Sequence, residues 1–102
     1  MINEMIIVSK KTIVDYYTVH KESKVAICDW YRKTLKAQWN NFAQLKNTFR
    51  TADYVGNKRV VFNISGGHFR IVAIVLFQVK RVFIRFIGTH NDYDNIKDIE
   101  NI

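Results

Sequence analysis

The chain has 102 residues, 48% of them hydrophobic, and its 16 Lys and Arg against 9 Asp and Glu give a net charge of +7. This length predicts a single domain, residues 1–102, with one modest core. The one cysteine excludes an internal disulfide and a cysteine-based zinc site, and no apolar run is long enough to span a bilayer.

The positive charge is concentrated in the body of the chain. Four of the nine acids stand at its carboxyl end: Asp92, Asp94, Asp98 and Glu100. A compact and strongly basic domain most often has a polyanionic partner, commonly nucleic acid, although charge can also serve solubility alone. The amino-terminal segment has no signal-peptide cleavage site, and a cytoplasmic protein is expected.

The first half of the chain is predicted to be mostly helical. Met5–Ser9 is a short β-branched run that predicts a first strand. Lys10–His20 has a loose helical period, and Ser23–Gln38 has a clearer one. Trp39–Phe49 is predicted to be a further short helical or irregular segment. The apolar stripe of the second helix is expected to comprise Val25, Ala26, Ile27, Trp30, Tyr31 and Leu35.

The second half is predicted to form two β-hairpins after a turn or loop over Arg50–Asn57. Gly66-Gly67 is a two-residue turn that tolerates positive φ, and the second turn is most simply Val79-Lys80. A longer loop of even length would leave the alternation of side chains unchanged. The three strands are expected at Lys58–Ser65, His68–Phe77 and Arg81–Gly88.

With these turns, the side chains of the three strands separate into two faces. One face is wholly apolar and is expected to bury against the helices, which predicts an α+β fold: a small twisted, mainly antiparallel sheet with the N-terminal helices on one face. This face comprises Phe62, Ile64, Phe69, Ile71, Ala73, Val75, Phe77, Val82, Ile84 and Phe86. The opposite face comprises Arg59, Val61, Asn63, Arg70, Val72, Ile74, Arg81, Phe83, Arg85, Ile87 and Thr89.

Three arginines on adjacent strands are expected to point from this second face. Arg70 is predicted opposite Asn63 and Thr89, while Arg59 and Arg85 are predicted opposite Ile74 from either side. The face has no acid in this prediction, so the guanidinium groups would remain unpaired and attract phosphate. The alternative is an ordinary solvated sheet face, on which arginine is common.

Two proton-transfer groups follow the last strand. If Thr89 caps a turn of helix, His90 and Tyr93 share one of its faces at positions i and i+3. Histidine titrates near neutral pH, whereas tyrosine would need neighbouring arginines in order to act as a base. His20 and His68 are expected to be structural or exposed, and no metal site or cofactor is predicted.

Several short motifs in one order and spacing resemble the HigB toxins of bacterial type II toxin–antitoxin modules, which belong to the RelE-like group. The matching residues are Asp53 with Val55-Gly56, Val61-Phe62-Asn63-Ile64, Gly66, Phe69-Arg70, Ile84-Arg85, Gly88-Thr89-His90 and Tyr93-Asp94. The similarity covers the C-terminal half closely and the helical half only by layout. One departure is Ser65-Gly66-Gly67, where relatives usually have Gly-Gly-Asn.

The resemblance implies a ribosome-dependent mRNA interferase that cuts mRNA in the ribosomal A site without metal. It implies neutralisation by a HigA-type antitoxin with a helix-turn-helix domain, and binding of operator DNA only through the toxin–antitoxin complex. Within this reading we expect Arg70, Arg85, His90 and Tyr93 to be catalytic. The residues expected to bind RNA are Lys58, Arg59, Asn63 and Arg81.

Two other classes of function remain open from the sequence. A non-enzymatic RNA- or DNA-binding module could use the same basic face, but stacking platforms need exposed aromatic side chains beside cations. Most aromatic residues of the strands fall on the apolar face, with Phe83 as the exception. A structural subunit whose basic face binds an acidic protein is the third possibility.

Overall fold

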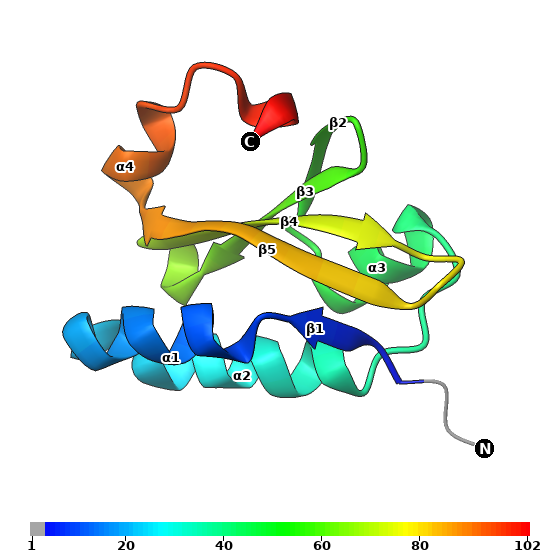
Figure 1. Ribbon diagram of the computed structural model, residues 1–102, viewed down its shortest axis with the longest axis horizontal. Coiled ribbons are helices and arrows are strands. Elements are labelled where there is room, and N and C mark those ends of the chain that lie inside the picture. The colour runs from blue at the N-terminus through cyan, green and yellow to red at the C-terminus, as the bar shows by residue number, and fades with distance from the viewer. Residues whose placement is uncertain (1–3) are drawn as a thin grey trace.

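A computed structural model describes residues 4–102 and shows an α+β fold built on one five-stranded sheet of order β1-β5-β4-β3-β2 (Figure 1). Only the β1–β5 pair is parallel, so the predicted fold class is confirmed. The strands are β1 (Ile6–Val8), β2 (Asp53–Gly56), β3 (Arg59–Ile64), β4 (Phe69–Leu76) and β5 (Arg81–Thr89). The helices are α1 (Lys10–Val19), α2 (Lys24–Leu35), α3 (Phe42–Thr48) and α4 (His90–Asp94), with single turns η1 (Lys21–Ser23), η2 (Ser65–Gly67) and η3 (Ile99–Asn101).

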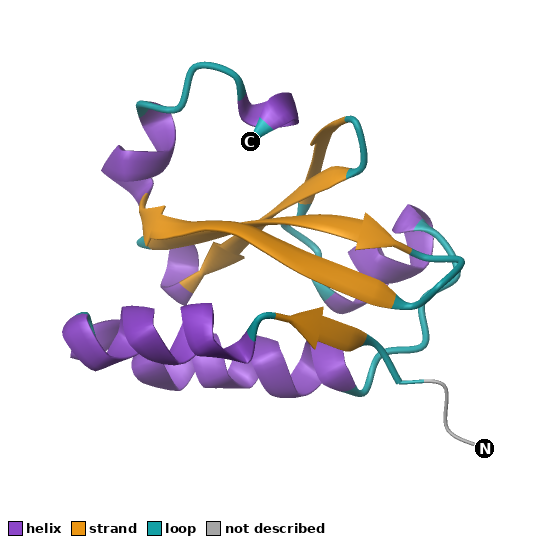
Figure 2. Cartoon of the chain, in the orientation of Figure 1, coloured by secondary structure: helices purple, strands orange, loops and turns teal. Residues whose placement is uncertain are grey.

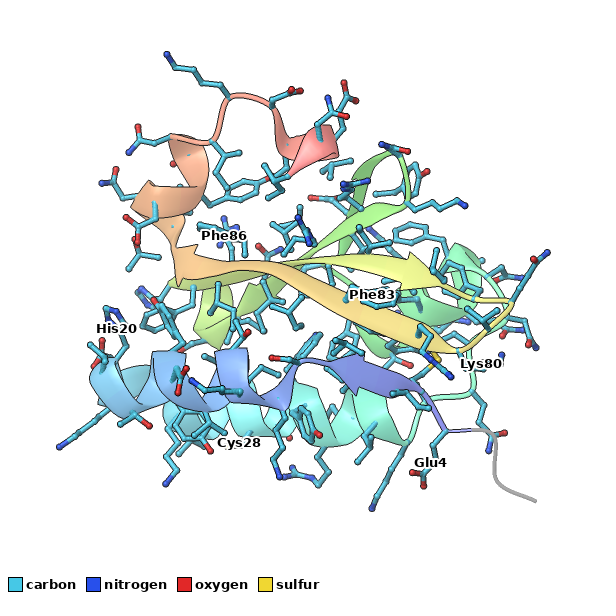
Figure 3. All side chains as sticks on the ribbon, viewed as in Figure 1. Glu4, His20, Cys28, Lys80, Phe83 and Phe86 are labelled. Atoms are coloured by element: carbon cyan, nitrogen blue, oxygen red, sulfur yellow. The ribbon has the colours of Figure 1, made fainter. Side chains whose placement is uncertain are left out.

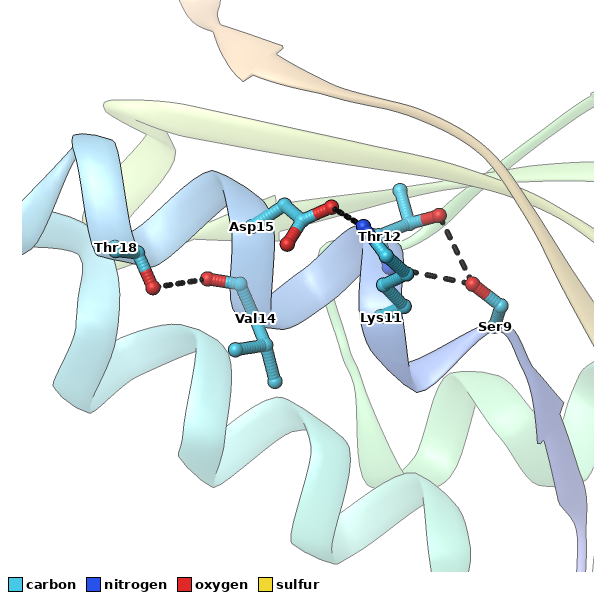
Figure 4. Close-up of polar contacts among 6 residues, drawn as sticks. All are labelled: Ser9, Lys11, Thr12, Val14, Asp15 and Thr18. Atoms are coloured by element: carbon cyan, nitrogen blue, oxygen red, sulfur yellow. Dashed lines mark hydrogen bonds and ion pairs between the residues drawn. The ribbon is translucent and has the colours of Figure 1, made fainter.

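The long helices begin and end close to the predicted positions. The Ser9 side chain caps α1 by accepting a hydrogen bond from the Thr12 main-chain N–H at 3.2 Å (Figure 4). Lys11 and Asp15 form an exposed ion pair one turn apart, at 2.6 Å. Between residues 4 and 102, no helix combines the length and the apolar character needed to cross a membrane.

The core lies between the two long helices and one face of the sheet. Trp30 of α2 is 1% exposed, and its ring meets the Phe62 ring edge-on at a centroid distance of 5.2 Å. Burial of side chains of this size stabilises the fold by about 1.5–3 kcal/mol each. The predicted apolar stripe of α2 is confirmed for Ile27 and Trp30, but Val25 is 84% exposed because it lies at the outer side of the helix.

The β3–β4 hairpin has the predicted register, with Asn63 opposite Arg70 and Arg59 opposite Ile74. Its connection is longer than a two-residue turn, because Ile64 pairs with Phe69 across four intervening residues. The predicted loop over residues 50–57 is wrong in part: Asp53–Gly56 forms the edge strand β2, antiparallel to β3. Its glycine and charged residue concealed the strand pattern.

The β4–β5 connection also differs from the predicted two-residue turn. Leu76 pairs with Arg81, so the connection has four residues and keeps the predicted alternation as far as Ile84. Lys80 within it adopts a positive φ of 55°. Its ammonium group donates to the Trp39 carbonyl oxygen at 2.7 Å and to Asn40 Oδ1 at 2.8 Å, which ties this loop to the segment before α3.

A β-bulge at Arg85 overturns the second part of the predicted register. Ala73 pairs with Ile84 but Val72 pairs with Phe86, so one extra residue lies in β5. A shift of one residue moves every later side chain to the other face. Phe86 therefore leaves the apolar face and Ile87 joins it, and Arg70 faces Gly88 instead of Thr89. Ile74 faces Phe83 instead of Arg85 because the β4–β5 connection has four residues and not two.

The sheet consequently has two unlike sides. The helices α1 and α2 lie along one side, while α4 and the chain that follows it are what residues 4–102 place on the other side (Figure 2). We call this second side the open face. The C-terminal segment returns over it to β2 and β3: Asn57 donates to the Glu100 carbonyl oxygen at 3.1 Å, and Arg59 donates to the Ile102 main-chain oxygen at 2.7 Å.

Candidate active site

Three of the four predicted catalytic residues, Arg70, His90 and Tyr93, lie at one end of the open face, where β5 runs directly into α4. The Thr89 hydroxyl accepts from the Asp92 N–H at 3.1 Å, and the Asp92 carboxylate accepts from the Thr89 N–H at 3.2 Å. This reciprocal capping box fixes the start of the helix, as the sequence predicts for Thr89. The helix therefore presents its side chains at a defined angle to the end of the strand.

Arg70 lies beneath this helix. Its guanidinium group donates a hydrogen bond to the Gly67 carbonyl oxygen in the β3–β4 turn. The same group lies 5.7 Å from the centre of the Tyr93 ring, within the range of a cation–π interaction. Arg70 is half-buried and so keeps part of its fork of donors available to an incoming anion.

Tyr93 is held from both sides. Its ring packs against Phe86 at a centroid distance of 6.5 Å, and Figure 3 shows Phe86 between β5 and α4. Burial raises the pKa of the Tyr93 phenol above its ordinary value of 10.0; the Arg70 guanidinium lowers this pKa, while Asp53 and Asp94 raise it. Because burial is the largest cause, the phenol stays protonated at neutral pH, which favours a proton donor over the base considered from the sequence.

His90 is the first residue of α4, and its side chain is about half-exposed. Its Nδ1 lies 2.8 Å from Asp94 Oδ2, one helical turn further on. A carboxylate on Nδ1 fixes the ring orientation and leaves Nε2 free to exchange a proton. The main-chain N–H of His90 donates to the His68 carbonyl oxygen at 3.0 Å, which joins α4 to the start of β4.

Gly88 allows the helix and the strand to approach one another. A Cβ atom added there would lie 2.5 Å from the Phe86 ring and 3.1 Å from the Asp92 Cβ. Gly88 is opposite Arg70, so a larger side chain would disturb the position of Arg70 as well as those of Phe86 and Asp92.

Replacing Gly88 by alanine should therefore lower the free energy of unfolding by about 1–3 kcal/mol, the usual cost of overpacking. Urea denaturation followed by circular dichroism measures this change. In a Phe86→Leu background the crowding ring edge is absent, and the same substitution should cost less. An equal cost in both backgrounds would contradict the proposed crowding.

Two other arginines of the predicted basic face, Arg59 and Arg81, do not lie beside Arg70 and Tyr93. Arg59 is on the open face, but its guanidinium group is engaged by the main-chain oxygens of Asn57 and Ile102. Its partner Ile74 is four residues from Arg70 along β4, a separation of about 13 Å. Arg81 pairs with Leu76, about 20 Å from Arg70 along the same strand, so it lies at the opposite end of the face.

The remaining predicted residues have separate surroundings. Arg85 is exposed at the bulge, and no hydrogen bond or ion pair links it to another residue within 4–102. Asn63 is beside Arg70, but its side-chain amide donates to the Thr51 carbonyl oxygen at 2.8 Å. Lys58 is exposed at the β2–β3 turn, where its main-chain N–H donates to the Tyr54 hydroxyl at 3.0 Å.

Three residues near the site were not predicted there. Phe86 reaches it only because of the bulge, which no feature of the sequence indicates. Gly67 contributes a carbonyl oxygen to Arg70. Asp53 lies on β2 opposite Val61, so the expectation of an open face without acids is wrong. The aromatic Tyr54 and the β-branched Val55, both favoured in strands, were the signal that could have revealed β2.

Neither a deep pocket nor a metal-ligand cluster coincides with the site. A pocket of about 580 Å³ opens beside α3 and includes Lys58 but none of the predicted catalytic residues. Within the described part of the chain, no group of three or more His, Cys, Asp or Glu side chains is arranged to hold a metal ion. The site is a surface cluster of the Arg70 guanidinium, the Tyr93 phenol beside it and the His90–Asp94 pair on the same helix as Tyr93.

Comparison with known proteins gives one consistent family. The model of the HigB toxin family, described as the RelE-like toxic component of a toxin–antitoxin system, matches residues 23–96. The chain is 32% identical over 87 residues to the mRNA interferase toxin HigB of Escherichia coli strain K12, covering 82% of this chain and 80% of that protein. The mRNA interferase HigB of Shigella flexneri matches to the same extent.

A more distant relative extends the match. The mRNA interferase HigB of Escherichia coli O6:H1 is 24% identical over 94 residues, which cover 90% of this chain and 91% of that protein. The resemblance noted on the motifs of the C-terminal half is thus confirmed over most of the chain. The chain belongs to the HigB family of RelE-like toxins, the toxic components of toxin–antitoxin systems.

Proposed function

We propose that the chain is an mRNA endoribonuclease that acts on messages during translation and is held inactive by its antitoxin. The main observation behind the proposal is the contact of the Arg70 guanidinium with the Tyr93 ring. Tyr93 belongs to α4, which also contains the His90–Asp94 pair. Relatives named mRNA interferases support the substrate class. The His90 and Asp94 side chains are about half-exposed at the surface, which suits a polymeric substrate.

The proposed reaction uses the 2′-hydroxyl of the RNA as its nucleophile. This oxygen attacks the adjacent phosphorus in line, the bond to the 5′-oxygen breaks, and a 2′,3′-cyclic phosphate remains. The protein has to accept the proton of the 2′-hydroxyl, stabilise the negative charge that gathers on the phosphoryl oxygens, and return a proton to the leaving 5′-oxygen.

Arg70 is suited to the charge-stabilising step. Its position is fixed before substrate arrives by the Gly67 carbonyl oxygen and by the Tyr93 ring. A preorganised guanidinium does not have to reorient as charge develops, which is the main source of such stabilisation. Arg85 is exposed on the neighbouring strand and can hold a flanking phosphate.

Proton transfer is divided between the two side chains of α4. Tyr93 stays neutral because burial raises its pKa, so it serves as the donor to the 5′-oxygen. His90 accepts the proton of the 2′-hydroxyl at Nε2, while the Asp94 carboxylate stabilises the imidazolium that forms. This assigns the direction that the sequence left open.

The RNA path requires a revision of the residues expected to bind flanking phosphates. Asn63 stays in this role as the neighbour of Arg70. Lys58, an exposed cation whose carbonyl oxygen accepts from the Val75 N–H, lies further along the face and would hold a more distant phosphate. Arg59 could contribute only after the C-terminal segment had moved, since Ile102 occupies its guanidinium. Arg81 is too distant for the same phosphates.

The ribosomal A site, a HigA-type helix-turn-helix antitoxin, and binding of operator DNA through the toxin–antitoxin complex complete the proposal. Membership of a toxin–antitoxin family supports an antitoxin partner, and the resemblance to HigB toxins is the basis on which we propose these three features. A toxin also has to work where translation occurs, which is why we propose the cytoplasm as its location.

Expression of the chain alone in bacteria tests the proposal. We expect growth to stop within minutes of induction, and sequencing of RNA 5′-ends to show new ends inside translated messages. Blocking initiation before induction should remove these ends if cleavage needs ribosomes. Continued growth with unchanged 5′-ends, at a verified level of folded protein, would contradict the proposed activity.

A further inference from the structure

We propose that the half of the open face away from Arg70 is the surface on which the antitoxin docks, through a segment with apolar side chains flanked by carboxylates. We call this surface the apolar patch; it comprises Ile6, Val8, Ile74, Leu76 and Phe83. The proposal rests on the antitoxin partner of the proposed function and names where that partner binds.

The strand pairings place these side chains next to one another. Val8 pairs with Phe83, and Phe83 pairs with Ile74, which makes one row across β1, β5 and β4. Ile6 and Leu76 lie in the next row, with Arg81 between them as the partner of both. Because side chains alternate along a strand, all of them project from the open face.

The buried neighbours in the same strands confirm this direction. Ile7, Val75 and Val82 alternate with the residues of the patch, and all three are at most 8% exposed within the core. Ile6 and Val8, by contrast, are 48% and 40% exposed. The patch is therefore the outer side of the edge at which β1 joins the sheet (Figure 3 labels Phe83).

The two halves of the open face differ in their cover. Val61 and Val72 project from the same face but are 3% and 0% exposed. Their half lies toward α4 and the returning C-terminal segment, which contacts β2 and β3. The C-terminal segment also reaches Arg59, the strand partner of Ile74, so it borders the apolar patch on its β3 side. On the β1 side, the exposure of Ile6 and Val8 shows that residues 4–102 provide no such cover. A sheet needs a packed layer on an apolar face, so the patch is suited to a layer supplied by another chain.

The charges around the patch indicate what that layer carries. Arg81 lies inside the patch and Arg85 is exposed two residues after Phe83. No carboxylate of the described chain forms an ion pair with either arginine. An apolar segment with acidic flanks would satisfy both features and would be attracted by the net charge of +7.

Other occupants fit the patch less well. Four of its five side chains are aliphatic, and RNA bases need aromatic surfaces for stacking, so RNA gains little there. A second copy of the chain would bring Arg81 and Arg85 against the same cations. Like charges at an interface cost several kcal/mol, which disfavours self-association.

The test uses the purified antitoxin encoded beside the chain and a variant with Ile6→Glu and Leu76→Glu. Each substitution removes an apolar anchor and adds a carboxylate that would repel acidic flanks. We expect the Kd for the antitoxin to rise at least about 10-fold for each single substitution and about 100-fold for the pair. Circular dichroism verifies that the variant is folded.

Val25→Glu is the matched control. Val25 is 84% exposed on α2, in the helical layer on the other side of the sheet, so its variant should bind the antitoxin as the wild type does. In cells, the Ile6→Glu/Leu76→Glu variant should still arrest growth but escape rescue by the antitoxin, whereas the Val25→Glu chain should be rescued.

Three results would contradict the docking proposal. A folded double variant with the wild-type Kd would overturn it, as would a variant that keeps this Kd but loses mRNA cleavage, because the patch would then bind RNA. A wild-type dimer that the double variant abolishes, seen by sedimentation, would assign the patch to a second copy. If the wild type arrests no growth, the proposed activity fails, and the Kd comparison still decides the docking site.

Discussion

Replacement of Arg70 by alanine should lower the rate of mRNA cleavage by about 100-fold or more, as loss of one charge-stabilising donor does in other enzymes. Among residues 4–102 the Arg70 guanidinium is the only cation over the Tyr93 ring, and it donates a hydrogen bond to the Gly67 carbonyl oxygen. Of the other arginines of the open face, Arg81 lies at its far end, Arg59 engages the C-terminal segment, and Arg85 is exposed at the bulge without a contact to Tyr93.

The same substitution should cost only modest stability. It removes one cation–π contact and one hydrogen bond, each worth about 0.5–1.5 kcal/mol in a partly exposed position. The variant should therefore remain folded, with a free energy of unfolding lower by about 1–3 kcal/mol. The loss of activity can then be attributed to the missing charge.

The measurement is the rate of cleavage of a defined mRNA in a reconstituted translation reaction. Arg32→Ala is the control, since Arg32 is exposed on α2 and pairs only with Asp29. Arg70→Lys should fall between alanine and the wild type, because lysine keeps the charge but not the fork of donors. If Arg70→Ala cleaves at the wild-type rate, the assignment of this residue is wrong.

Replacement of Tyr93 by phenylalanine should lower the cleavage rate by about 100-fold, a typical contribution of one positioned proton donor. Phenylalanine preserves the ring that packs on Phe86 and under which Arg70 lies. The change therefore removes the hydroxyl alone. Because burial raises the pKa of this phenol, the group it removes is a protonated one.

Single-turnover cleavage and urea denaturation together test this prediction. The unfolding midpoint should change little, while the rate of the chemical step falls and the affinity for RNA is retained. Tyr17→Phe supplies a control, as Tyr17 packs in the helical layer beside Lys24. A Tyr93→Phe chain as active as the wild type would show that another group protonates the 5′-oxygen.

Much of the fold follows from local sequence patterns. The helical periods predict α1 and α2, and the alternation of Phe62, Ile64, Phe69 and Ile71 predicts which side of the β3–β4 hairpin is buried. These patterns are reliable because each records a face that has to leave water. The capping role of Thr89 was likewise predictable from residue type and position.

The bulge at Arg85 was not predictable. One extra residue in β5 leaves the local pattern of alternating apolar side chains plausible in either register, because both Phe86 and Ile87 are apolar. Only the packing of Phe86 against Tyr93 and of Ile87 against the core selects one register. This is a tertiary effect, so sequence periodicity carries no signal for it.

Only part of the candidate site could be predicted, because its assembly also depends on the register of the strands. The Arg70 guanidinium lies over the Tyr93 ring, and His90 is on the same helix as Tyr93. The predicted convergence of Arg59 and Arg85 depended on the length of the β4–β5 connection, which places Phe83 opposite Ile74, and on the course of the C-terminal segment. Neither could be derived from the spacing of the residues.

Removal of a single 2′-hydroxyl from the RNA tests whether that group is the nucleophile. The cleavage position in a synthetic mRNA is mapped with the wild-type chain, and the nucleotide on its 5′ side is then replaced by its 2′-deoxy form. If the 2′-hydroxyl is the nucleophile, we expect cleavage at this position to disappear, while an unmodified message is cut to leave a 2′,3′-cyclic phosphate. Cleavage of the deoxy-substituted message at the same position and rate would contradict it.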